Sequence, residues 1–486
     1  MAATMKPALR PLRTVAIRAS PSPGCRYVSS TSNARSSLAS AERASTSNVI
    51  HHPPLQRSDP GSPLSILPLS TVLRSLIILS ISSSPILLKP CIYTLSVLAN
   101  PKNPVLDVAR NPLLNWLVKN TIYKQFNAGE NKAEVQRSIE EIKRLGYRGV
   151  LLGYAREVLV GESKGPLDEK AARQDVETWL KGTLQTVDMA HEGDFVALKL
   201  TGMGAQALEL LQKQLPPPDY IDSAIRAVCD SAIARGARLL VDAEEQAVQP
   251  GIEAWTLRYQ KYCNSKTPGR ATMYGTYQAY LRSTPTTIAK HLEISRQEGY
   301  TLGVKLVRGA YLKTEPRHLI WSTKEETDRC YDGIVEALLT RQYNSTLKPA
   351  SGEAHANKEL PPVNVIIATH NQDSVRKAHS LRLQQAARGE PRVELAYAQL
   401  QGMADEVSCE LVQGYRSGNS EEPKAAALEN PNVYKLLTWG SVKECMGFLM
   451  RRAVENTEAV ARTQQSKTAM AAELKRRLRK ALGFAN

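Results

Sequence analysis

Two cations and a glycine turn follow an apolar run near the middle of the chain. The run reads Gly303-Val304-Lys305-Leu306-Val307-Arg308-Gly309-Ala310-Tyr311. An ammonium and a guanidinium group attract anions, and a glycine turn lets the backbone approach a ligand closely. A structural ion pair would also explain the two cations. We favour a seat for an anionic cofactor, because both charges stand where a strand ends and a turn begins.

A second charged element lies near the C-terminus, in the run Phe448-Leu449-Met450-Arg451-Arg452-Ala453-Val454-Glu455-Asn456. Helical spacing of three and four residues places Phe448, an arginine and Glu455 on one face. Guanidinium groups match the two oxygens of a carboxylate, so the arginine pair could bind an acid. A solvated charged face is the usual explanation of two adjacent arginines in a helix. It would not predict matching cations at a strand end, so we interpret the two elements together as an anion clamp.

Short apolar runs alternate with helical patterns beyond residue 145, and these elements must position the charged groups. Eight such runs occur, at Gly149–Tyr154, Phe195–Leu200, Arg238–Val241, Ala271–Tyr277, Gly303–Val307, Val363–Ala368, Val393–Ala398 and Val433–Leu437. Strands that alternate with amphipathic helices form parallel βαβ units. Eight units favour a closed (β/α)8 barrel of the α/β class, with an open doubly wound sheet as the alternative.

Polar side chains gather where these runs end. They are Glu157, Lys199, Asp242, Glu244, Gln278, Lys305, Arg308, Thr369, His370, Asn371 and Gln399. In a barrel the carboxyl ends of the strands meet at one face, where active sites are built. So many polar groups would be costly to bury unless they served a site. Lys199 and Asp242 come from neighbouring strands and could pair across the barrel mouth, which would keep the lysine protonated.

The positive charge of the chain lies largely at its ends. Of the formal net charge of +16, six charges fall in residues 1–41 and a net five in 467–486, which leaves +5 for the remainder. Residues 1–41 contain no acid and many Ser and Ala, a composition typical of a mitochondrial transit peptide. A disordered basic tail is the alternative interpretation. Because the central part carries so little excess charge, a nucleic-acid function loses most of its support.

Cysteine and histidine spacing argues against a metal or a disulfide framework. The seven cysteines are scattered without a CxxC pair, and the eight histidines contain no HExxH pair. We therefore predict no metal. Residues 64–99 are apolar, but Arg74, Lys89, Pro85 and Pro90 interrupt them, so a spanning helix is not indicated. They could pack against the catalytic domain or a second subunit, or lie in a membrane interface.

With these residues in view, the chain resembles the proline dehydrogenase family, in its eukaryotic mitochondrial branch. The motifs that carry the resemblance are VKLVRGAYL at 304–312, ATHN at 368–371, DAEEQ at 242–246 and RRxxEN at 451–456. The resemblance covers roughly residues 100–465. It implies a distorted (β/α)8 TIM-like barrel with an N-terminal helical segment and a final helix over the barrel mouth.

The resemblance and the composition together divide the chain into four parts. We expect a transit peptide over 1–45, a linker and helical arm over 46–145, the barrel over 146–465 and a basic helix or tail over 466–486.

The resemblance also implies FAD as the cofactor and roles for the residues around it. Lys305 would lie near the flavin N5 edge, and Arg308, Gly309 and Ala310 would line the cofactor channel. Bacterial relatives carry the two cations in swapped order. The residues that the resemblance assigns to cofactor binding are Gln278, Lys305, Arg308, Gly309, Thr369, His370, Asn371 and Glu455.

A second group of residues is assigned to the substrate and to catalysis. By resemblance Lys199 contacts the substrate carboxylate, Asp242 positions it, and the arginine pair completes the clamp from above. Glu157 is a candidate partner of Arg451 in a lid-closing ion pair. The full group is Lys199, Asp242, Arg451, Arg452, Leu436, Phe448, Ala310, Leu400 and Glu157.

The implied reaction is oxidation of L-proline to Δ1-pyrroline-5-carboxylate, with hydride transfer from C5 to the flavin N5 and electrons passed to ubiquinone. It places the protein in mitochondria, on the matrix side and associated with the inner membrane. The basic tail and the 64–99 segment are the expected contact surfaces. An oligomer is compatible with the sequence.

Two pocket positions depart from the family pattern. Leu436 stands where most relatives carry a tyrosine on the eighth strand, and Phe448 replaces another tyrosine on the last helix. Relatives that prefer hydroxyproline also differ at the eighth-strand position, so the substrate is less secure than the reaction. The alternatives are a dehydrogenase of hydroxyproline or another cyclic imino acid, and a flavin-binding paralogue without turnover. None of Lys199, Lys305, Arg451 or Arg452 is lost, which favours an enzyme.

Overall fold

The computed structural model describes residues 62–99, 101, 103–156, 168–350, 359–413, 429–458 and 460–483. The expected transit peptide and the candidate residue Glu157 lie outside the described residues. The side chains of 85 and 456–461 are not described either.

Eight parallel strands close into a barrel, because β9 pairs with both β8 and β2. The strands are β2 (Gly149–Tyr154), β3 (Phe195–Leu198), β4 (Arg238–Val241), β5 (Met273–Gln278), β6 (Leu302–Val307), β7 (Val363–Ala368), β8 (Leu395–Leu400) and β9 (Asn432–Trp439). A short additional strand, β1 (Asn127–Gly129), pairs in parallel with β9. The predicted barrel is confirmed, and each of the eight predicted runs overlaps one of its strands.

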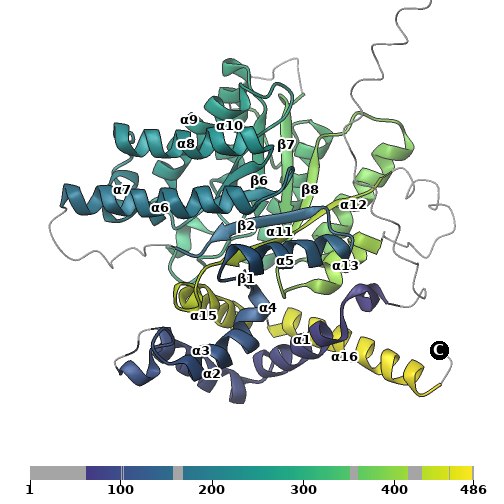
Figure 1. The fold of residues 1–486 in the computed structure, drawn as a ribbon. Coiled ribbons are helices and arrows are strands. Elements are labelled where there is room, and N and C mark those ends of the chain that lie inside the picture. Colours follow the sequence, from purple (N-terminus) through teal and green to yellow (C-terminus); the bar gives the residue numbers. More distant parts are fainter. Residues whose placement is uncertain are drawn as a thin grey trace, which may run out of the picture. The chain divides into compact units, whose positions relative to one another are not determined.

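Helices surround the strands, as Figure 1 shows. After α4 (Lys124–Phe126), those of the barrel are α5 (Lys132–Arg144), α6 (Glu169–Met189), α7 (Ala205–Gln212), α8 (Asp219–Arg235), α9 (Gln249–Asn264), α10 (Thr284–Glu298), α11 (Lys324–Thr340), α12 (Gln372–Ala387) and α13 (Asp405–Gln413). Turns of 3-10 helix occur at Pro63–Ile66, Pro104–Leu106, Leu200–Met203 and Arg317–Leu319, and a π-helical turn at Lys119–Tyr123. Two C-terminal helices follow, α15 (Val442–Glu458) and α16 (Val460–Ala481).

Local sequence signals fix several helix ends. Thr323 and Glu326 form a reciprocal capping box at the start of α11, which satisfies two backbone N–H groups that the helix leaves unpaired. Asn131 and Asp168 cap α5 and α6 with their side-chain oxygens. Helix α8 ends at Gly236, whose φ of 70° is a left-handed conformation that glycine adopts without steric cost. These boundaries set where each helix returns the chain to the barrel.

The core lies on both sides of the strands. One cluster fills the barrel interior and includes Leu151, Phe195, Leu240, Ile366 and Tyr434. Two larger clusters lie between the outer faces of the strands and the helices. Burial on both faces explains why the strands read as nearly continuous apolar runs in the sequence. The alternation of inward and outward side chains then decides which residues at the strand ends face the barrel mouth.

The N-terminal segment forms three helices, α1 (Leu69–Ser82), α2 (Pro85–Ala99) and α3 (Pro112–Val118). Helix α1 packs against α16, and α2 packs against α15. Two apolar clusters hold these contacts; one joins Leu95 and Leu98 to Leu449, and the other joins Val72 to Met470. The expectation that residues 64–99 pack against the catalytic domain is therefore confirmed. Helix α16 begins before the expected boundary at residue 466.

Within the described part of the chain, no single helix is both long and apolar enough to cross a membrane. Helices α1 and α2 reach that criterion only together, and a bend of 98° separates them.

Candidate functional site

A buried ion pair occupies the barrel mouth. Lys305, on β6, donates from Nζ to Oδ1 of Asp242, which follows β4, at 2.7 Å. Both side chains are largely withdrawn from solvent, with 5% of Lys305 and 22% of Asp242 exposed. An ion pair in low dielectric is strong, so it fixes the direction of the ammonium group. The cation that the sequence singled out is thus fixed at the carboxyl end of its strand.

Strand register places further polar groups beside this pair. Thr276 pairs with Lys305 across β5 and β6, and its buried Oγ1 has no hydrogen-bond partner among the described residues. Lys199 directly follows β3, whose Leu198 pairs with Val241 just before Asp242. Its side chain is half-buried, and its carbonyl accepts a hydrogen bond from the Trp179 indole at 3.0 Å.

The sequence suggested that Lys199 and Asp242 could pair across the mouth. In the structure Asp242 pairs with Lys305, a partner that the sequence did not suggest. Strand alternation predicts that all three side chains face the mouth, but it does not determine which cation reaches the carboxylate. Both lysines nevertheless lie where the sequence placed them, near the carboxyl ends of their strands, β3 and β6.

Arg308 is held at the rim by side chains from three elements. Its Nε donates to Thr369 Oγ1 at 3.1 Å, its Nη2 donates to Ser374 Oγ at 2.8 Å, and its Nη1 pairs with Asp328. Burial opposes ionisation of Asp328, but Lys324 and Arg308 outweigh it and hold the pKa of that carboxyl below its usual range. The guanidinium also lies 5.0 Å from the ring centroid of Tyr331. Arg308 therefore joins the ends of β6 and β7 to α11 and α12.

The Thr369-His370-Asn371 turn connects β7 to α12. Asn371 caps the helix by accepting from Ser374 N at 3.0 Å, and Thr369 Oγ1 accepts from Asn371 N at 3.1 Å. The backbone N–H of Leu400 donates to Nε2 of His370 at 3.1 Å, so this nitrogen carries no proton.

His370 is held neutral by its surroundings. Burial lowers the pKa of its imidazole well below the ordinary value of 6.5, and the cations Arg462, Lys435 and Arg452 lower it further. A neutral ring whose Nε2 accepts a hydrogen bond has its proton on Nδ1, which can donate to a ligand. His370 is thus suited to hydrogen bonding rather than to carrying charge at the mouth.

Two glutamines lie buried at the strand ends. Nε2 of Gln278 donates to the carbonyl of Glu244 at 3.0 Å, and Nε2 of Gln399 donates to the carbonyl of Thr369 at 3.3 Å. The Oε1 atom of Gln399 is buried without a partner in the described structure. The Glu244 carboxylate accepts from Thr201 Oγ1 at 2.7 Å. These residues link neighbouring strand ends and keep the rim in one arrangement.

The turn after β6 presents bare backbone. Gly309 has a φ of +146°, and a Cβ at this position would lie 2.3 Å from the ring of Tyr280. Gly309 and Ala310 are both exposed. Only glycine fits this backbone conformation and this close contact, so the sequence choice leaves the turn open to a ligand on its outer side.

Helix α15 carries the second half of the predicted clamp. Nη2 of Arg452 donates to Glu455 at 2.6 Å, and its guanidinium lies 4.9 Å from the ring centroid of Phe448. Arg452 is buried and Arg451 is half-buried. Phe448 and Leu400 pack at the edge of the cluster that includes Leu449, which fixes α15 beside the end of β8.

Leu436 completes the wall from inside the barrel. It is half-buried and packs against the interior cluster that contains Leu151 and Tyr434. No contact of Glu157 can be described, because that residue lies outside the described part of the chain.

Sequence reasoning missed two residues at this site. Thr276 could have been found from strand alternation, because it precedes Gln278 by two positions and shares its face. Arg462, on α16, is half-buried. Its charge lowers the pKa of His370, and the Glu455 carboxylate acts in turn to raise the pKa of Arg462. No spacing in the sequence signals Arg462, since it lies beyond the recognisable RRxxEN motif.

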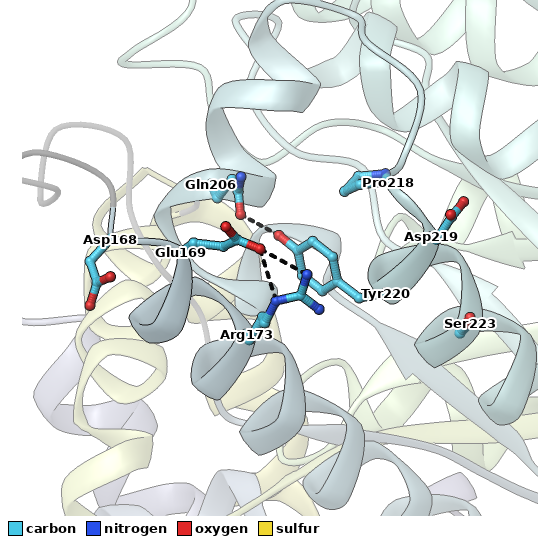
Figure 2. A pocket seen from close by; sticks show the side chains of 8 residues that line it. All are labelled: Asp168, Glu169, Arg173, Gln206, Pro218, Asp219, Tyr220 and Ser223. Carbon is cyan, nitrogen blue, oxygen red and sulfur yellow. Dashed lines mark hydrogen bonds and ion pairs between the residues drawn. The ribbon is translucent and has the colours of Figure 1, made fainter.

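A separate surface pocket lies on the outer helices, at α6, α7 and α8. Figure 2 shows that some of its polar groups pair with one another: Arg173 with Glu169, at 2.8 Å, and Tyr220 with Gln206. Arg173 also stacks over the Tyr220 ring at 4.6 Å. None of the predicted site residues lines this pocket, so it is not the site that the sequence indicates.

The closed parallel barrel is a TIM-like barrel. Its carboxyl face, where active sites of this fold lie, carries cations, a carboxylate and a neutral histidine. A family model described as proline dehydrogenase matches residues 135–465. The chain belongs to the proline dehydrogenase family.

Individual relatives are similar over different lengths. Proline dehydrogenase 1, mitochondrial, of Caenorhabditis elegans is 35% identical over 251 residues, which cover 52% of this chain and 37% of that protein. The probable mitochondrial proline dehydrogenase of Schizosaccharomyces pombe is 26% identical and covers 75% and 81%. Hydroxyproline dehydrogenase of Xenopus laevis is 27% identical and covers 84% and 87%. The chain thus spans little more than a third of the worm protein and most of the other two.

A solved structure shares the fold. Proline utilization A from Bdellovibrio bacteriovorus aligns with a TM-score of 0.55 at 16% identity, over 82% of this chain and 40% of that one. At this identity the likeness shows the fold alone.

Proposed function

We propose that the protein oxidises L-proline to Δ1-pyrroline-5-carboxylate with FAD as its cofactor and ubiquinone as electron acceptor. The observation that carries the proposal is the buried Lys305–Asp242 pair at the barrel mouth, 2.7 Å apart. Family membership supports the same reaction. A cation fixed at this position stabilises negative charge that develops beside it, and no water needs to reorganise.

The residues present fit a flavin nucleotide. The buried Thr276 Oγ1 and Gln399 Oε1 lack partners among the described residues, so the mouth holds polar atoms that a ligand would satisfy. The exposed turn at Gly309 and Ala310 offers backbone N–H groups of the kind that bind phosphates. Bound FAD would supply the hydride acceptor.

The remaining chemistry belongs to the side chains of the chain. Lys305 would supply positive charge to the electron-rich reduced flavin, and Asp242 fixes the direction of the lysine's ammonium group. Lys199, Arg451 and Arg452 bind the substrate carboxylate, which places the C5–H bond in one orientation. Glu455 holds the guanidinium of Arg452 at 2.6 Å. Neutral His370 donates a hydrogen bond without adding charge, and Thr369, Asn371, Gln278 and Arg308 keep the rim in register.

Hydroxyproline is the second candidate substrate. Leu436 and Phe448 bring no hydroxyl group to the pocket wall, and the Xenopus relative named hydroxyproline dehydrogenase aligns over most of both chains. A pocket that binds a substrate hydroxyl must supply a partner for it, whereas an apolar wall discriminates weakly against one. We therefore keep proline first.

We place the enzyme in mitochondria, on the matrix side of the inner membrane. The names of the worm and yeast relatives include the word mitochondrial. A lipid-soluble quinone as acceptor requires that the protein approach a membrane, and the cations of α16 provide attraction to an anionic surface.

Anaerobic titration of the purified full chain tests this proposal. The bound nucleotide is first released and identified by mass spectrometry, and the protein is then titrated with L-proline and, separately, with trans-4-hydroxy-L-proline while flavin absorbance is followed. We expect FAD, bleached faster by proline. Faster bleaching by hydroxyproline would establish the second candidate. A bound flavin that neither substrate reduces would contradict both and favour a paralogue without turnover.

A further inference from the structure

The outer sides of α1, α2 and α3 expose large apolar side chains, and we call this surface the α1–α3 face. Its members are Leu69, Leu73, Ile77, Ile86, Leu87, Tyr93, Leu113, Trp116 and Leu117. Ile86 is 84% exposed, Leu113 74% and Trp116 62%. The other large exposed apolar side chains in the described structure are Val105 and Leu106 on the adjoining turn, Leu478 on α16, Leu482 just after that helix, and Leu215 and Leu312 elsewhere. Large apolar side chains exposed in such number on one segment mark an interaction site.

Helical spacing makes each exposed set a stripe. Leu69, Leu73 and Ile77 recur every four residues along α1, and Leu113, Trp116 and Leu117 share one side of α3. The opposite sides of α1 and α2 are already used, because they pack against α16 and α15. The stripes therefore remain outside after the fold is complete, and Figure 1 shows these helices and α16 together below the barrel.

The charge around the α1–α3 face has one sign. Lys89 is exposed on α2, Arg110 before α3 and Lys124 after it, and Lys475 and Arg479 are exposed on α16. In the described residues up to Phe126 and from Val460 onward, the acids are Asp107 and Glu473, and both are buried. Glu473 is consumed by ion pairs with Arg476 and Arg477. Within these two stretches the exposed charges are therefore cations, which complement an anionic surface.

We infer that the α1–α3 face docks on an anionic lipid surface and lies in its interface. The inference rests on the proposed function only for the reason why the protein would dock, which is access to a quinone acceptor dissolved in the membrane. Apolar side chains would enter the boundary of the acyl chains, Tyr93 and Trp116 would lie at headgroup level, and the flanking cations would meet lipid phosphates. A second copy of this chain fits less well, because the same face on both copies would oppose cation to cation.

The docked helices lie directly behind the candidate site. Leu95 and Leu98, on the inner side of α2, share a cluster with Leu449 of α15, and Phe448 and Leu400 pack against that cluster. Helix α15 also carries Arg451 and Arg452. Docking through α2 would therefore hold the barrel mouth close to the lipid, where a hydrophobic electron acceptor has its highest concentration.

Flotation with lipid vesicles tests the inference on the full chain. Vesicles of phosphatidylcholine alone are compared with vesicles that also contain phosphatidylglycerol. The test variant combines Ile86→Glu, Leu113→Glu and Trp116→Glu. The matched control combines Leu215→Glu and Leu312→Glu, which are exposed apolar side chains elsewhere. We expect binding of the wild type to the anionic vesicles, weakened on the order of tenfold or more in the test variant and unchanged in the control.

Other outcomes would overturn the inference. They are failure of the wild type to bind anionic vesicles, equal binding by the test variant, or a wild-type dimer in size-exclusion chromatography that the test variant dissociates. Circular dichroism and reduction of a water-soluble dye by proline are measured on the same preparations. Vesicle binding without dye reduction would refute the proposed function and leave the docking intact. Dye reduction without vesicle binding would refute the docking and leave the proposed oxidation of proline intact.

Discussion

The two ends of the barrel each bury a cation against a carboxylate, yet their surroundings differ. At the amino end Arg238 pairs with Glu394 and lies over the Phe195 ring at 5.0 Å. At the carboxyl end Lys305 pairs with Asp242. Arg238 is enclosed by aromatic rings of the interior cluster, whereas Lys305 adjoins the unpartnered Thr276 hydroxyl and an open glycine turn. A buried ion pair therefore indicates chemistry only when a ligand could reach it.

The largest effect should follow from removing the cation at the mouth. Lys305→Met deletes the charge that would stabilise the reduced cofactor and leaves Asp242 without its ammonium partner. We expect proline oxidation, measured as dye reduction per bound flavin, to fall by about 100-fold to 1,000-fold. Retention of more than a tenth of the activity would remove the distinction between the two ends.

The pair at the amino end should affect folding instead. Arg238→Met leaves Glu394 without its partner, and we expect a loss of about 3 kcal/mol in the free energy of unfolding. Dye reduction per bound flavin should stay within about twofold of the wild type, because the amino end of such a barrel contributes to stability and not to catalysis. Urea denaturation supplies the first quantity. A variant that folds normally but fails to oxidise proline would reverse our assignment.

Backbone at the open turn offers a third test. Gly309→Ala introduces a Cβ into the Tyr280 ring at a φ of +146°, and displacement of the turn should weaken FAD binding about tenfold. Gly389→Ala is the matched control, because Gly389 also has a positive φ, +65°, but nothing lies within 4 Å of its Cβ. The control should lose only about 1 kcal/mol of stability and no FAD affinity. Equal loss of affinity in both variants would mean that the turn does not contact the cofactor.

The Thr276 hydroxyl sharpens the contrast further. Thr276→Val replaces an unpartnered hydroxyl by a methyl group, so the protein without FAD should be as stable as the wild type or slightly more stable. If the hydroxyl binds the ligand, FAD affinity should fall by a few fold, or about 1 kcal/mol. Isothermal titration calorimetry measures the FAD affinity, and thermal unfolding measures the stability of the protein without FAD. A destabilised variant with normal affinity would show that Thr276 only supports the barrel.

The smallest effect concerns pH. His370 stays neutral in the folded protein because burial and nearby cations lower its pKa, whereas the unfolded chain takes up a proton below pH 6.5. Stability must therefore decrease as the pH falls below that value. Between pH 6.5 and 5.5 we expect at most about 1 kcal/mol of this decrease to disappear in His370→Gln. An identical pH slope in both proteins would show that His370 titrates normally.

The sequence predicted much of the barrel because each strand is apolar on both faces and is followed by a turn. Runs such as Gly149–Tyr154 and Val363–Ala368 coincide with β2 and β7. The barrel topology also predicted that the polar residues at the strand ends, among them Lys199, Asp242 and Lys305, gather at the mouth. It could not predict that Asp242 reaches Lys305, because that depends on the rotamers and the tilt of the strands.

Long-range packing was beyond the reach of the sequence. Helices α1 and α16 pack together although they lie near opposite ends of the described sequence, and no local sequence pattern indicates that they are partners. The binding of Arg308 by Asp328 and Ser374 likewise depends on how two helices begin beside one rim. From the sequence, the exposed stripe on α1 could be identified only as apolar. Both sides of this helix carry apolar residues, and only the packing of α16 on one of them distinguishes the buried side from the exposed side.

Rapid anaerobic mixing with L-proline tests the central claim most directly. The rate of flavin bleaching is measured for the wild type, Lys305→Met and Arg238→Met, each corrected for its bound flavin. We predict fast bleaching in the wild type and in Arg238→Met, and bleaching slowed by at least about 100-fold in Lys305→Met. Equal rates in the wild type and Lys305→Met would contradict the claim that the ion pair at the carboxyl end serves the chemistry.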